Sequence, residues 1–139
     1  MKNAHRIFGL AFLAVFLGTG AYMRLRFPAA FREDMGMRMM FRSAHLYILL
    51  AALLNLVAGA HLRTRAFNWR RRVQGVGSGC LLASPMVFTA AFFAEPAPQR
   101  LDRPIVLLAA ALALLGAILH TIASYEKDAG AKVYGGTSS

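Results

Sequence analysis

The chain has 139 residues, a length that indicates one domain. Apolar residues make up 58% of it and charged residues only 16%, against roughly 45–50% and about 25% in soluble domains. The net charge is +10, and a single cysteine excludes a disulfide-stabilised scaffold. Nucleic-acid binding would explain the charge but not so apolar a composition. We therefore expect a membrane protein with no nucleic-acid partner.

Four stretches of the chain carry no charged side chain: residues 7–23, 43–62, 73–94 and 104–125. A helix needs about 20 residues, within a range of about 17–25, to cross the hydrocarbon core. None of the stretches alternates with period 2, as barrel strands do, and short connections force neighbouring helices to be antiparallel. We predict an all-α fold, an integral membrane four-helix up-down bundle with short connecting loops. It forms one domain over residues 1–139, with a tail over 126–139.

Basic residues predict the orientation of these helices. Nine of them fall on the side of the two termini and seven on the other side. The connection 63–72 is the strongest signal, because it has five arginines and no acidic residue. Since cytoplasmic loops are enriched in Lys and Arg, we predict an inner-membrane protein with both termini in the cytoplasm.

The first stretch has an alternative interpretation. Lys2 and Arg6 precede a short apolar run and small residues at 18–21, a pattern that also fits a cleavable signal peptide. We favour retention as the first helix, because Arg24 and Arg26 can extend to the membrane surface and lengthen a short span.

Connection 63–72 is also predicted to contact anionic lipid headgroups. Tryptophan favours the membrane interface, and each basic residue near an anionic surface contributes about 1 kcal/mol. The residues concerned are Arg63, Arg65, Trp69, Arg70, Arg71 and Arg72.

Small and polar residues predict how the helices pack, because helix contacts in lipid rely on close approach and interhelical hydrogen bonds. Gly75 and Gly79 form a Gly-x-x-x-Gly step, and Asn55 should hydrogen-bond a neighbouring helix. Pro85 lies inside the third stretch and predicts a kink there. One face of the fourth stretch carries Ala113, Gly116 and Ala117.

Three histidines are predicted to lie at one level of the membrane: His5, His61 and His120. Imidazole is a common metal ligand and an axial ligand of haem iron. One hypothesis is therefore a haem b between His61 and His120, or a three-histidine metal site that includes His5. The alternative is that these side chains only meet water and headgroups, and His61 lies about 160° around its helix from His45.

A methionine-rich segment suggests copper as another ligand. Thioethers favour Cu(I), and the segment precedes a histidine; the residues are Met35, Met37, Met39, Met40 and His45. The alternative is an interfacial packing surface, since methionine is also a flexible filler.

The sequence predicts no catalytic residues. No Asp, Glu, Lys or Arg lies inside the four stretches, which argues against an ion-coupled transporter, and no nucleophile shares its expected depth with a histidine. We predict a non-catalytic accessory protein that packs against a larger membrane complex or against copies of itself. The alternatives are a haem- or copper-binding redox or metal-handling protein and, with least support, a small transporter.

Overall fold

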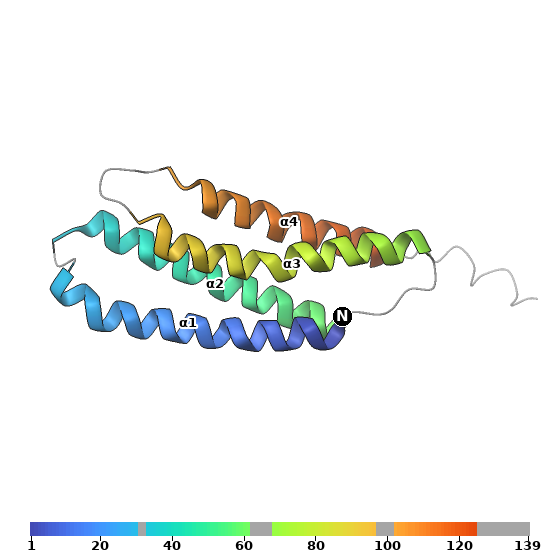
Figure 1. The fold of residues 1–139 in the computed structure, drawn as a ribbon, viewed down its shortest axis with the longest axis horizontal. Helices are drawn as coiled ribbons and strands as arrows, with labels where there is room; N and C mark the ends of the chain where they lie inside the picture. Colours follow the sequence, from blue (N-terminus) through green and yellow to red (C-terminus); the bar gives the residue numbers. More distant parts are fainter. Residues whose placement is uncertain (31–32, 62–67, 97–101, 125–139) are drawn as a thin grey trace, which may run out of the picture.

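The computed structural model describes residues 1–30, 33–61, 68–96 and 102–124. They form four α-helices that alternate in direction along the chain (Figure 1). The helices are α1 (Lys2–Ala30), α2 (Met35–His61), α3 (Asn68–Ala94) and α4 (Pro104–Ser124). The predicted all-α up-down bundle of four helices is confirmed.

Each of the four helices is long and apolar enough to cross a membrane. The shortest, α4, has 21 residues, and at about 1.5 Å per residue it matches a hydrocarbon core of about 30 Å. The other helices have 27 to 29 residues, so they extend beyond that core. The chain is a multi-pass membrane protein.

Helices α1 and α2 are longer than the uncharged stretches that predicted them. Helix α1 continues past Arg24 and Arg26, which are exposed, and α2 begins at Met35. Asp34 caps α2, since its Oδ1 accepts a hydrogen bond of 2.9 Å from the backbone N–H of Met37. The start of α2 is therefore set by its capping residue, Asp34, and the charged side chains that follow it do not interrupt the helix.

The helices pack as two pairs. Helix α1 packs along α2 and α4 along α3, and the pairs meet mainly through α2 and α3. Figure 1 shows α1 and α4 on opposite outer sides. We call one end of the bundle the histidine end, because His5, His61 and His120 lie there, and the other, with Glu95 and Arg103, the glutamate end.

Aromatic and small side chains fill the interface between the pairs. The ring of Phe41 on α2 lies 5.1 Å from that of Phe92 on α3, measured between centroids. Phe92, Ile48 and Ala51 are fully buried, whereas Phe93 is 64% exposed. Lipid accepts such an exposed apolar ring, so the fit between side chains, more than the removal of apolar surface from water, stabilises the interface.

Helices α3 and α4 come close together at Gly77 and Gly116. A Cβ atom on Gly77 would lie 3.2 Å from the carbonyl oxygen of Gly116, and one on Gly116 would lie 2.9 Å from that of Gly77. Apart from the adjoining residues and backbone of α3 itself, no described atom lies within 4 Å of the corresponding position at Gly75 or Gly79. The close contact predicted for those two glycines is therefore found at Gly77. The predicted face of α4 turns inward, with Ala113 and Gly116 buried and Ala117 half-buried.

Candidate functional site

All four helices contribute to a polar cluster at the histidine end. His5 of α1 is fully buried, and its Nδ1 lies 2.8 Å from Oδ1 of Asn55 on α2. Its ring centroid is 5.9 Å from that of His120 on α4, with the ring planes at 74°. The Nε2 of His120 lies 3.1 Å from the hydroxyl of Ser78 on α3. The cluster thus joins the two helix pairs.

Pro85 explains why Asn55 lies where it does. Proline has no backbone N–H, so the carbonyl of Leu81, four residues earlier, loses its helical partner. That carbonyl instead accepts hydrogen bonds from Nδ2 of Asn55 at 2.7 Å and from the hydroxyl of Ser84 at 3.0 Å. Asn55 Nδ2 also donates to the carbonyl of Ala51 at 2.9 Å. The interhelical hydrogen bond predicted for Asn55 is present.

These bonds fix the tautomer of neutral His5. Both hydrogens of the Asn55 amide are directed at carbonyl oxygens, so its Oδ1 is the acceptor toward His5. Nδ1 of His5 must then carry the hydrogen, which leaves Nε2 with a lone pair. This Nε2 is buried and has no hydrogen-bond partner in the described part of the chain. A buried acceptor without a partner is rare and suggests a ligand.

The ring of His120 lies against α3. A Cβ atom on Gly77 would be 3.3 Å from Cδ2 of His120, and Nε2 faces Ser78. The bond between Cδ2 and Nε2 therefore faces α3, and Nδ1, the ring atom opposite that bond, points away from it. Glycine at position 77 is what gives the ring this room.

A pocket of about 460 Å³ opens beside this cluster. Ligand pockets typically enclose about 300–1,000 Å³. Half of its described lining residues are apolar and half carry an uncharged polar group, and they come from α2, α3 and α4. The apolar residues are Leu54, Val57, Ala58, Leu81 and Ala117, and the polar ones are His61, Gln74, His120, Thr121 and Ser124.

The structure brings His61 and His120, the predicted haem ligands, to this one pocket. His61 is exposed, and its Nδ1 lies 3.1 Å from the carbonyl oxygen of Val57. Since a carbonyl only accepts, Nδ1 is the donor, and Nε2 of a neutral His61 is left free. The predicted set of three histidines is not brought together, because no three His, Cys, Asp or Glu side chains within the described ranges are close enough to share a metal ion.

The contact between Ser78 and His120 was not expected from the sequence, which placed no histidine at the depth of a nucleophile. A serine bound to an imidazole is also the arrangement of a hydrolase nucleophile and its base. Ser78, however, is buried and does not line the pocket. It also lies well inside α3, where backbone N–H groups are bonded within the helix and cannot form an oxyanion hole. The pair therefore fits a structural role.

The side chains of the methionine-rich segment differ in burial, and His45 contacts α1. The segment belongs to the first turns of α2, so successive side chains diverge: Met37 is buried, Met40 is half-buried, and Met35 and Met39 are exposed. The ring of His45 stacks on Phe16 at 4.0 Å, and its Nδ1 lies 2.8 Å from the hydroxyl of Thr19. The copper site proposed for these residues stays a prediction.

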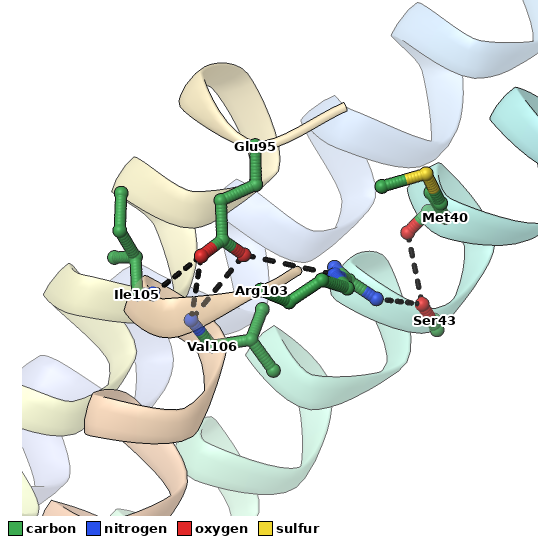
Figure 2. A network of polar contacts seen from close by, with 6 residues as sticks. All are labelled: Met40, Ser43, Glu95, Arg103, Ile105 and Val106. Carbon is green, nitrogen blue, oxygen red and sulfur yellow. Dashed lines mark hydrogen bonds and ion pairs between the residues drawn. The ribbon is translucent and has the colours of Figure 1, made fainter. Parts of the chain in front are cut away.

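At the glutamate end, a second polar network joins the helix pairs (Figure 2). The carboxylate of Glu95 accepts hydrogen bonds from the backbone N–H groups of Ile105 and Val106 in the first turn of α4. It also lies 3.6 Å from Nε of Arg103, whose Nη1 donates to the hydroxyl of Ser43 on α2. Glu95 is therefore the N-terminal cap of α4, and Arg103 links that cap to the other pair.

The predicted headgroup residues lie at the start of α3. Trp69 is 54% exposed, with the guanidinium of Arg70 at 5.4 Å from its ring centroid. Arg71 and Arg72 are exposed, which suits the membrane surface. Arg63 and Arg65 lie outside the described residues.

The chain was compared with protein-family models, curated proteins and solved structures, and no match was found in any of them.

Proposed function

We propose that this multi-pass membrane protein is a non-catalytic binding protein for a small neutral molecule with an apolar body and a hydrogen-bonding head group. The observation that carries the proposal is the pocket at the histidine end, of about 460 Å³, which combines apolar walls with uncharged polar side chains. Such a combination of shape and a few polar groups is typical of small-molecule sites.

The lining favours a neutral ligand over a charged one. Its polar groups are the imidazoles of His61 and His120, the amide of Gln74 and the hydroxyls of Thr121 and Ser124. Among the residues that the structure describes, no Arg, Lys, Asp or Glu contributes to it. An ionised ligand would lose hydration on entering the site without gaining an opposite charge, which is costly. A hydroxyl or carbonyl head group meets donors and acceptors at no such cost.

A photoaffinity experiment in membranes tests this proposal. The probe is a long-chain alcohol with a diazirine, compared with the corresponding fatty acid. We expect the alcohol to label the peptides 54–61 and 117–124 more strongly than the acid does.

Two variants on α4 control for non-specific labelling by lipid-soluble probes. Thr121→Trp places an indole in the pocket and should abolish most of that labelling. Ile122→Trp changes an exposed neighbour that does not line the pocket and should leave it unchanged. Equal labelling of the two variants would show that the probe marks the lipid-facing surface only.

The haem prediction has one observation in its favour, namely that His61 and His120 line the same pocket. A b-type haem there would give the purified protein a Soret band, which His120→Leu should remove. A colourless protein purified after haem supplementation would rule this prediction out.

The accessory role predicted from the sequence remains a prediction with its own test. In the apolar part of α1 only 11% of the residues are buried in the bundle, and no other described helix packs against Gly79 on α3. A partner helix that approaches α3 there would be displaced by Gly79→Leu. Loss of a co-purified membrane subunit, or of a homo-oligomer, in this variant would support the role, and an unchanged monomer would contradict it.

We retain the inner membrane and two cytoplasmic termini as part of the proposal, supported by the excess of basic residues on that side. A reporter that is active only in the cytoplasm should be active when fused to either end of the chain. Activity at one end and none at the other would refute the orientation.

A further inference from the structure

A pair of imidazoles lies beside the pocket, namely His5 and His120, of which His120 also lines the pocket. Nε2 of His5 has a lone pair, no partner within the described ranges and no solvent exposure. The two nitrogens of an imidazole point in nearly opposite directions. Since Nδ1 of His5 is bound to Asn55 on α2, Nε2 points away from α2, and the neighbouring ring is that of His120 on α4.

The separation of the two rings suits a shared metal ion. With metal–nitrogen bonds of about 2.0–2.1 Å, two imidazoles on one ion have centroids about 5 to 6.5 Å apart, from tetrahedral to linear geometry. The observed separation is 5.9 Å. The ring planes are free to differ in orientation, so the angle of 74° between them is compatible with binding.

Both rings also have the supporting contacts that metal-binding histidines need. Such a histidine donates the hydrogen of its other nitrogen to a nearby acceptor, which fixes the ring and its tautomer. Asn55 Oδ1 has this role for His5, and the hydroxyl of Ser78 is placed to have it for Nε2 of His120. The remaining nitrogens, Nε2 of His5 and Nδ1 of His120, are the ones turned away from these contacts.

The charge of the surroundings selects the ion. The two ligands are neutral, and no carboxylate or thiolate joins them, since the described residues hold no group of three potential ligands. The cost of burying an ion rises with the square of its charge, so a monovalent ion is favoured over a divalent one at this buried site without charged ligands. Among the first-row metals that imidazole binds, copper is the one with a stable monovalent state. We propose that His5 and His120 bind one Cu(I) ion, at a site distinct from the predicted methionine segment.

Anaerobic titration of the full chain in mild detergent, with Cu(I) competing against a colorimetric chelator, tests the proposal. The wild type should take up one equivalent of Cu(I) and bind Zn(II) more weakly. His5→Leu and His120→Leu should each lower the Cu(I) affinity by about 100-fold or more, and Asn55→Leu, which removes the orienting contact, by about 10–100-fold. His45→Leu and His61→Leu are the matched controls and should leave it unchanged.

A second measurement does not depend on the variants folding. In wild-type protein labelled with ¹⁵N-histidine, Cu(I) should shift the ring nitrogens of His5 and His120 and leave those of His45 and His61 in place. Absence of one-equivalent binding by the wild type, preferential binding of Zn(II), or shifts at the other two histidines would overturn the proposal. Thr121→Trp should keep full Cu(I) binding, so failure of the pocket proposal and failure of the copper proposal are distinguishable.

Discussion

Replacing Asn55 with leucine, a side chain of similar size, removes the polar link between the two helix pairs at the histidine end. The variant loses the hydrogen bonds of Asn55 to His5 and to the carbonyl of Leu81. An interhelical side-chain hydrogen bond in a membrane contributes about 0.6 kcal/mol on average and up to about 1.7. The expected loss in the free energy of unfolding for two such bonds is therefore about 1–3 kcal/mol.

Unfolding in mixed micelles with increasing SDS, followed by far-UV circular dichroism, measures this loss. A double-mutant cycle of Asn55→Leu with His5→Leu then isolates the bond between the two side chains. We expect a coupling free energy of about 0.6–1.7 kcal/mol, measured without metal so that copper binding does not contribute.

The cycle can refute the reasoning directly. Non-interacting sites are additive to within about 0.3–0.5 kcal/mol. A coupling within that limit would mean that His5 and Asn55 do not share a hydrogen bond, and the assignment of the His5 tautomer would fall with it. His45→Leu combined with Asn55→Leu is the control, because His45 bonds to a different residue.

Three further predictions use the same unfolding measurement. Gly77→Leu should lower the free energy of unfolding by about 1–3 kcal/mol, because α4 and the His120 ring fill the space around Gly77. Gly79→Leu should change it by less than about 0.5 kcal/mol. Equal effects of the two substitutions would contradict the observed contact between α3 and α4. Phe92→Ala should cost about 2 kcal/mol more than Phe93→Ala, because only the first leaves a cavity, and similar costs would place both rings in lipid. Glu95→Ala should cost about 1–2 kcal/mol through loss of the α4 cap and speed hydrogen exchange in the first turn of α4; unchanged exchange there would show that the carboxylate is not the cap.

The membrane-spanning helices were predictable because charge is excluded from hydrocarbon, so runs without charge mark the spans. Their ends were not, since Arg24 and Arg26 remain helical beyond the span. The end of α1 and the start of α2 depend on local capping. Asp34, three residues before Met37, was the signal in the sequence for the start of α2.

The sequence predicted the depth in the membrane at which the histidines of the candidate site lie, but it did not predict which side chains contact one another. Alternating helices place His5, His61 and His120 at one end, as the structure shows. Which rings meet depends on the rotation of each helix about its axis, and two similar glycine patterns on α3 allow different rotations. The partner of Asn55 had a usable signal in Pro85, because a proline always frees the carbonyl four residues earlier. No signal in the sequence pointed to the contact between Ser78 and His120.

Pro85 has one further consequence, for the vertical alignment of the helix pairs. The only carbonyl it frees is that of Leu81, and Asn55 binds it from the other pair. Sliding α3 along α2 by one helical turn, about 5.4 Å, would bring Asn55 to a carbonyl already engaged in its own helix. Moving the proline by a single position would rotate the free acceptor by about 100° around α3, out of reach. The proline thus sets the register between the hairpin of α1 and α2 and the hairpin of α3 and α4. In lipid, hydrophobic contact alone would let the two hairpins slide past each other.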